Sequence, residues 1–185
     1  DAVGEAYDKV GKMLGVGYPG GPIIDRLAQD GRADAIAFPR AMIKHDNFDF
    51  SFAGLKTAVA VHLDKHGQPD SLEALRDLCA SFQAAVVEVL VHKSLRALRA
   101  TGLRRIHVVG GAAANSGLRT QLTEAAEREG FVFRPAPLVY CGDNAAMIAA
   151  AAAARIEAGV PPRIDLYANR PLDHQAMRVD GEAAR

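Results

Sequence analysis

Apolar side chains recur every three to four residues in two stretches of the chain, which is the spacing of a helix with one buried face. In residues 4–14 the apolar positions are Ala6, Val10, Met13 and Leu14. A longer pattern spans residues 71–100, and its apolar positions are Leu72, Leu75, Cys79, Phe82, Val86 and Val89. We therefore predict a short and a long helix, each packed along one apolar stripe.

Glycine and proline mark a turn after the first predicted helix. The segment 15–21 reads GVGYPGG, and Pro22 after it suits the first position of a new helix. Asp25 is then expected in the first turn of that helix, where a carboxylate complements the helix dipole. The functional alternative is that Asp25 accepts hydrogen bonds from ligand hydroxyls. Asp8 on the first helix has the same two interpretations, a solvated surface acid or a ligand-facing one.

Residues 36–52 alternate apolar and polar positions, which predicts extended structure. Pro39 confines the first run to an edge or a loop. Phe48, Phe50 and Phe52 would share one face and form core. A further helix is predicted from Gly54 to residue 66.

His62 and His66 stand four residues apart at the end of that helix, a spacing found in metal sites. No glutamate follows the first histidine as in H-E-x-x-H, and no third ligand is evident. Histidines at a helix C-terminus are also favoured by the helix dipole. We therefore do not predict a metal site at this pair.

The stretch IHVVGGAAANSGLR, residues 106–119, combines a short strand, two glycines and the start of a helix. We expect a buried strand at residues 106–109 and a helix from Asn115 to about Arg128. Ligands of open α/β folds sit beyond the carboxyl ends of strands, where helix N-termini present free N–H groups. A phosphate-bearing ligand would suit this turn. An ordinary turn with Asn115 as helix cap is the alternative, because GG-x-x-x-N alone is a weak motif.

The last patterned stretch begins with an edge strand at residues 131–133, which Pro135 and Pro137 end. A second strand then leads from Leu138 to Asp143, and an alanine-rich helix runs on to about Gly159. Asp143 is either a helix N-cap or a carboxylate that faces a metal or phosphate at the end of a strand.

Composition favours a single-core protein without a disulfide framework or an overall basic charge. The chain has 185 residues, 49% of them apolar, and a formal net charge of zero, so it has enough material for one core and no overall basic field to collect nucleic acid. Basic residues gather only at residues 92–105, as a solvated helix end or as a phosphate-contacting patch for RNA. Two cysteines make no disulfide framework, and no signal peptide or long apolar span is evident, so we expect a cytoplasmic protein with no membrane partner.

Four stretches occur in a fixed order: VGEAYDKVGKMLGVGYPGGPIID, FDFSFAGLKTAV, HVVGGAAANSGLR and CGDNAAMIA. Together they resemble TsaD, the family that makes threonylcarbamoyladenosine in tRNA. The resemblance implies an α/β lobe of the actin-like ATPase and ribonuclease H-like class, the fold of sugar kinases and heat-shock ATPases, with a central mixed sheet flanked by helices. Residues 1–172 would form the C-terminal lobe of this two-lobed fold and residues 173–185 a polar tail. Because the chain opens directly in a helix without Met, we interpret it as a piece of a longer polypeptide.

The resemblance also implies an activity. Members of the family transfer the threonylcarbamoyl group of threonylcarbamoyl-adenylate to the exocyclic amine of the adenosine 3′ of the tRNA anticodon. Asp8, Gly21, Asp25 and Asn115 match positions that bind the adenylate or an ATP-type nucleotide. Asp143 matches the carboxylate ligand of one divalent metal ion, iron or zinc.

Some implied parts lie outside this sequence. The family's H-x-x-x-H metal pair belongs to the other lobe, and His62 and His66 do not occupy its place, so these residues by themselves are expected to be inactive. The implied partners are tRNA, a catalytically degenerate paralogue and a small ATPase. Two other functions stay open from the residues: a kinase or ATPase of the same fold, and a scaffold without catalysis.

Overall fold

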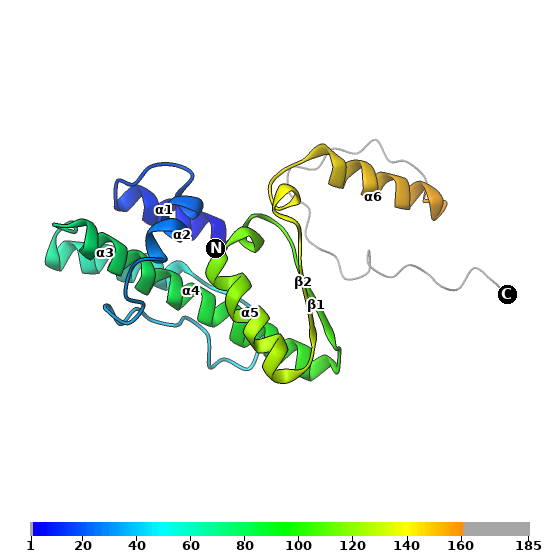
Figure 1. The fold of residues 1–185 in the computed structure, drawn as a ribbon, viewed down its shortest axis with the longest axis horizontal. Coiled ribbons are helices and arrows are strands. Elements are labelled where there is room, and N and C mark those ends of the chain that lie inside the picture. Colours follow the sequence, from blue (N-terminus) through cyan, green and yellow to red (C-terminus); the bar gives the residue numbers. More distant parts are fainter. Residues whose placement is uncertain (1, 161–185) are drawn as a thin grey trace. The chain divides into compact units, whose positions relative to one another are not determined.

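The computed structural model describes residues 2–160 (Figure 1). Its elements in chain order are α1 (Val3–Met13), α2 (Gly20–Ala28), α3 (Ala53–His66), α4 (Leu72–Thr101), β1 (Arg105–Val108), η1 (Gly111–Ala114), α5 (Ser116–Glu129), β2 (Val132–Pro135), η2 (Leu138–Tyr140) and α6 (Ala145–Glu157). The chain divides into two compact units, Asp1–Asn144 and Ala145–Arg185, and each is described by itself. The long helix α4 organises the first unit. It begins where predicted because the Ser71 side chain accepts a hydrogen bond from Ala74 N at 3.1 Å.

The first half of α4 is surrounded by α1, α2 and α3, and we call this group the helical cluster (Figure 1). Its buried core consists of Ala6, Tyr7, Val10, Leu14, Ile24, Phe38, Phe52, Leu55, Val59, Leu78, Cys79, Phe82, Ala85 and Val86. The rings of Tyr7 and Phe82 meet edge to face, with centroids 5.1 Å apart. The predicted stripe of α4 is therefore mostly core, although Leu72 at its start is exposed.

The second half of α4 packs against α5 and the two strands, and we call this group the sheet cluster (Figure 1). Its buried core consists of Val87, Val91, Leu95, Leu118, Leu122, Ala125 and Phe131. β1 and β2 are parallel, with Ile106 opposite Phe133. The strands predicted at residues 106–109 and 131–133 are thus present, and the chain is an α/β protein with a two-stranded parallel sheet in the part that the structure describes.

The expectation that β1 is a buried strand is wrong. Arg105 and His107 are exposed, and only Ile106 and Val108 pack against the sheet cluster. Val109, just beyond the strand, is 73% exposed. Helices cover one face of these two strands within Asp1–Asn144, so alternate side chains stay in solvent.

The prediction for residues 36–52 is also wrong. The segment forms turns and irregular structure, and Phe48 and Phe50 are exposed by 51% and 42%. Of the three phenylalanines expected to share a face, only Phe52 is core, because it directly precedes α3 and its ring packs into the helical cluster. Among residues 2–160, no strand lies beside this segment, so its backbone has no partner with which to form a β-ladder.

The strand predicted at Leu138 is a 3-10 turn instead. Tyr140 N donates to Pro137 O at 2.9 Å and Cys141 N donates to Leu138 O at 3.1 Å, so the chain folds back on itself there. The helix that follows is α6, close to its predicted bounds. Cys79 and Cys141 are both buried and free, as expected from the composition.

Within residues 2–160, no helix is both long and apolar enough to cross a bilayer. The predicted tail, residues 173–185, lies outside the described residues.

Candidate functional site

A hollow of about 960 Å³ lies where α1, α2 and α4 meet the η1 turn and the segment 141–143. All five residues singled out from the sequence line it, namely Asp8, Gly21, Asp25, Asn115 and Asp143. Its apolar wall comes from Val86, Val87 and Leu90 of α4. A cavity of several hundred cubic ångströms with an apolar wall and a few polar groups is typical of a small-molecule site.

The Asp8 carboxylate joins α1 to α2. Its Oδ1 accepts a hydrogen bond from Gly20 N at 2.8 Å, at the point where α2 begins. The helix therefore starts before Pro22, and Asp25 falls in its second turn rather than its first, which corrects both predictions. Asp8 is half-buried and lines the hollow, and a carboxylate has acceptor capacity beyond the one bond from Gly20 N.

Two adjacent glycines at the start of α2 differ in what surrounds them. A Cβ at Gly20 would lie 2.5 Å from Tyr7 O, so this glycine lets α2 approach the backbone of α1. A Cβ at Gly21 would meet no atom within 4 Å. Packing thus requires Gly20, which the sequence analysis did not single out, whereas the space beside Gly21 is open to the hollow.

The Asp25 carboxylate is the hub of a hydrogen-bond network. Its Oδ1 accepts from Gln83 Nε2 at 3.0 Å and from Asn115 Nδ2 at 3.1 Å. Ser116 donates to the same oxygen through Oγ at 2.7 Å and through its backbone N at 3.1 Å. The other oxygen, Oδ2, also lies 3.1 Å from Ser116 N and keeps capacity for a further donor. Asp25 therefore fastens α2 to the start of α5.

Asn115 is the N-cap of α5, as one of its two interpretations predicted. Its Oδ1 accepts from Leu118 N at 2.9 Å. Its Nδ2 donates within reach of three acceptors: Gln83 Oε1 at 2.8 Å, Asp25 Oδ1 at 3.1 Å and Tyr7 Oη at 3.2 Å. Capping and lining the hollow are thus compatible roles, because the two ends of one amide serve them separately.

Sequence reasoning missed Tyr7 and Gln83. The Tyr7 hydroxyl donates to Gln83 Oε1 at 3.3 Å, and burial together with the negative charge of Asp25 raises the pKa of Tyr7, so the hydroxyl keeps its proton. Gln83 is only 7% exposed although its side chain is polar. A glutamine inside the apolar stripe of α4, directly after Phe82, was the signal that could have identified it.

Asp143 lines the hollow from an exposed position. α6 begins at Ala145, so Asn144, not Asp143, directly precedes it. Among residues 2–160, no three His, Cys, Asp or Glu side chains lie close enough together to hold a metal ion. Asp143 is therefore a single carboxylate at this edge of the hollow, and the described residues alone do not make a metal centre.

The other two candidate regions are engaged in local contacts. The rings of His62 and His66 stack with centroids 4.4 Å apart, and His66 Nδ1 lies 2.9 Å from His62 O. In the basic stretch, Lys93 is 1% exposed and its Nζ donates to Asn47 Oδ1 at 2.7 Å. Arg99 pairs with Glu129 at 2.6 Å. These contacts disfavour a continuous phosphate-binding patch, because two of its cations already have partners inside the chain.

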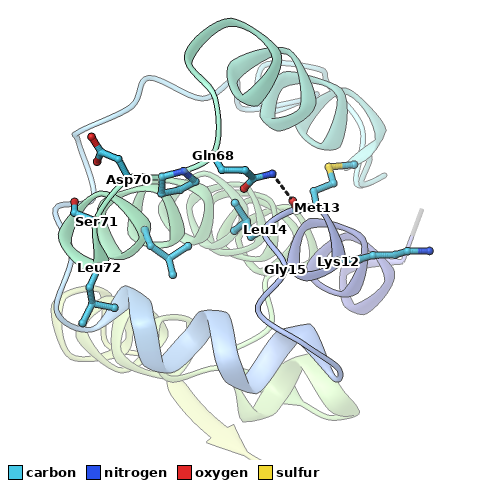
Figure 2. Close-up of a pocket in the computed structure, with 10 residues that line it drawn as sticks. Lys12, Met13, Leu14, Gly15, Gln68, Asp70, Ser71 and Leu72 are labelled. Carbon is cyan, nitrogen blue, oxygen red and sulfur yellow. Dashed lines mark hydrogen bonds between the residues drawn. The ribbon is translucent and has the colours of Figure 1, made fainter.

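A second, more open hollow of about 540 Å³ lies between the end of α1 and the start of α4 (Figure 2). It is lined by residues 12–15, residues 68–72 and Leu75. Gln68 Nε2 crosses it to donate to Met13 O at 2.9 Å (Figure 2). None of the five residues predicted from the sequence lines this hollow, so we treat the first hollow as the candidate site.

Comparison with known proteins gives one consistent result. A family model described as TsaD, tRNA N6-adenosine threonylcarbamoyltransferase, matches residues 1–150. The chain is similar to proteins named tRNA N6-adenosine threonylcarbamoyltransferase from Syntrophotalea carbinolica (53% identity, 94% of this chain and 51% of the relative) and Sorangium cellulosum (52% identity, 90% and 47%). A relative of the same name from Trichlorobacter lovleyi is 51% identical over 95% of this chain and 52% of its own length. The chain thus spans about half the length of the curated relatives it matches.

Proposed function

Because the chain belongs to the tRNA N6-adenosine threonylcarbamoyltransferase family, we propose that the full-length protein transfers a threonylcarbamoyl group from threonylcarbamoyl-adenylate to tRNA. The acceptor is the exocyclic amine of the adenosine 3′ of the anticodon. Its nitrogen bonds to the carbamoyl carbon and loses a proton, and the bond from that carbon to the phosphate oxygen breaks. AMP leaves with the electron pair of the broken bond.

The observation that carries this proposal is the convergence of Asp8, Gly21, Asp25, Asn115 and Asp143 on one hollow. The adenylate is already activated, so the protein needs no nucleophilic side chain, and positioning can supply most of the rate. Gly21 offers backbone and open space to phosphate or ribose. The free acceptor capacity of Asp8 and Asp25 suits ribose hydroxyls.

The fold assignment is part of the same proposal. Residues 1–172 would form the C-terminal lobe of an actin-like, two-lobed protein, and the adenylate or an ATP-type nucleotide would bind between the lobes. The position of Asn115 supports this, since it stands after a parallel strand and at a helix start, where α/β folds bind nucleotides. The family name favours transfer over the kinase, ATPase and scaffold alternatives.

A divalent metal ion, iron or zinc, belongs to the proposal only through Asp143. A carboxylate oxygen is a suitable ligand for either ion, but one ligand does not hold a metal tightly. Within residues 2–160, no three His, Cys, Asp or Glu side chains could hold a metal ion. The remaining ligands would therefore come from outside these residues. We therefore derive no step of the reaction through the metal.

The proposed partners are tRNA, a catalytically degenerate paralogue and a small ATPase, with a cytoplasmic location. The name of the matched family supports the first of these. The described surface does not favour residues 92–105 as the place where tRNA binds, because Lys93 and Arg99 contact Asn47 and Glu129.

The proposal is tested with Asn115→Ala in the full-length protein. We expect threonylcarbamoyladenosine in substrate tRNA, measured by mass spectrometry, to fall by about 100-fold or more, because a site group is lost. Asn115 also caps α5, and losing a cap costs about 1 kcal/mol. Ser71→Ala, which removes the cap of α4 away from the site, is the matched control and should keep its activity. Equal modification by both variants would refute the proposed function of the site.

A further inference from the structure

We propose that Gln83 is a positioning residue of this site, a buried amide that fixes the orientation of the Asn115 amide and the Asp25 carboxylate. The inference rests on the proposed function. Gln83 does not line the hollow itself, whereas Asp25 and Asn115 do. It therefore lies behind the two residues that would meet a ligand.

Both ends of the Gln83 amide are in use. Its Nε2 donates to Asp25 Oδ1 at 3.0 Å, and its Oε1 accepts from Asn115 Nδ2 at 2.8 Å. Tyr7 Oη donates to the same Oε1 at 3.3 Å. One side chain of α4 thus connects α2 of the helical cluster with the start of α5 in the sheet cluster.

The donor and acceptor roles in this hydrogen-bond network are fixed by Asp25 at one end and by the backbone N–H of Leu118 at the other. A carboxylate only accepts hydrogen bonds, so Asp25 requires the NH₂ of Gln83 to face it. The backbone N–H of Leu118 requires an acceptor, so Asn115 must turn its Oδ1 to α5 and its Nδ2 to Gln83. Turning the Gln83 amide over would place oxygen against oxygen and NH₂ against NH₂. The buried glutamine therefore permits one orientation of Asn115.

Gly117 provides the space for this arrangement. A Cβ at this position would lie 3.2 Å from Gln83 Nε2 and 3.4 Å from Asn115 Oδ1. Gly117 lies within α5 and has no positive φ, so its backbone conformation does not call for glycine. The contact with the Gln83 amide is what disfavours a larger residue there.

The first test is Gln83→Met in the full-length protein, which keeps a similar side-chain volume and removes the hydrogen bonds of Gln83 to Asp25, Asn115 and Tyr7. We expect kcat/KM for transfer from threonylcarbamoyl-adenylate to tRNA to fall about 10- to 100-fold, because Asp25 and Asn115 each lose the hydrogen bond that orients them toward one another through Gln83. Ser81→Ala is the matched control. Ser81 is also buried in α4, but its hydroxyl bonds Ile36 N and Arg32 O, away from the hollow. It should lower the melting temperature and keep kcat/KM within about twofold.

The second test is Gly117→Ala, which leaves Gln83 intact. The helix preference of alanine offsets part of the cost of displacing the Gln83 amide, so the melting temperature should change little while kcat/KM falls. A purely structural role of the network predicts no loss of activity in this variant. If Gln83→Met does not fold, Gly117→Ala decides alone. The inference is overturned if these variants keep kcat/KM within twofold of the wild type.

A third readout separates this inference from the proposed function. Hydrogen exchange at the backbone amides of Ser116 and Leu118 reports whether Asp25 and Asn115 hold their places, with or without activity. We expect faster exchange at both amides in Gln83→Met and unchanged exchange in Ser81→Ala. A wild type without transfer activity refutes the proposed function. Unchanged exchange at these amides in Gln83→Met refutes the role of Gln83.

Discussion

The helical cluster and the sheet cluster share α4 but are stabilised differently. Three helices surround the first half of α4, and side chains such as Phe82 and Val59 are fully buried there. Beside the second half, α5 covers one face of the two strands, and Val109 projects into solvent. The helical cluster is therefore held in place by apolar packing on several sides of α4. The site joins the two groups through polar contacts of Asp25 with Ser116 and Gln83.

This difference explains how the site can be both rigid and accessible. Asp8 and Asp25 stand on helices held by a closed core, so their positions are set by apolar packing. Asn115 stands at the edge of the more open group, and directed hydrogen bonds set its orientation. A hydrogen-bonded junction of this kind is sensitive to the loss of one partner, because the remaining buried groups are left unsatisfied.

The largest expected contrast in stability compares Phe82→Ala with Val109→Ala in the full-length protein. Phe82 is fully buried in the helical cluster, so its truncation should cost about 3–5 kcal/mol through lost burial and a cavity. Val109 is exposed beyond β1, and its truncation should change stability by no more than about 0.5 kcal/mol. Thermal unfolding measures both. Similar losses would show that the sheet cluster is covered as fully as the helical cluster.

A smaller contrast compares two ion pairs under acid. Hydrogen bonds from Arg32 lower the pKa of Asp77 in the helical cluster, and those from Arg99 lower the pKa of Glu129 in the sheet cluster. A carboxyl group whose pKa is lower in the folded than in the unfolded protein stabilises the fold. This stabilisation is complete above the pKa of the unfolded state, which is near 4, and is lost as the pH falls through the pKa of the folded state. Asp77→Asn and Glu129→Gln should each reduce the dependence of melting temperature on pH in this acid range.

The effect should be larger for Asp77, whose side chain is 9% exposed against 25% for Glu129. Asp77 also accepts from the backbone N of Arg32 at 2.8 Å, whereas the Arg99 hydrogen bonds to Glu129 all come from the arginine side chain. An equal or greater change for Glu129→Gln would contradict the ranking of the two clusters. Asp30→Asn, at an exposed carboxylate paired with Arg76, serves as the surface control.

The elements with a strong local signal could be predicted from the sequence. The stripe of α4, the cap at Ser71 and the Asn115 start of α5 all depend on residues within a few positions of one another. The errors concern tertiary surroundings. Whether Phe48 is core depends on what lies beside it, which its alternating pattern does not encode. Likewise, the start of α2 is set by Asp8, twelve residues before Gly20.

The candidate site follows the same division. Asp8, Gly21, Asp25, Asn115 and Asp143 were identifiable as polar or glycine residues at helix and turn positions, and through the family resemblance. Tyr7 gives no such signal, and Gln83 gives only that of a polar residue within an apolar stripe. The role of both residues depends on the packing of α1, α2, α4 and α5.

The most direct test of the account is the affinity of the full-length protein for a non-reactive analogue of threonylcarbamoyl-adenylate, measured by calorimetry in Gly21→Ala and Asp143→Ala. The Cβ added at Gly21 meets no atom within 4 Å, and Asp143 is exposed, so both variants should keep the melting temperature of the wild type. If Gly21 of α2 and Asp143 contact the same ligand, each variant should bind the analogue about tenfold or more weakly than the wild type does. Full affinity in either variant would contradict a single shared site.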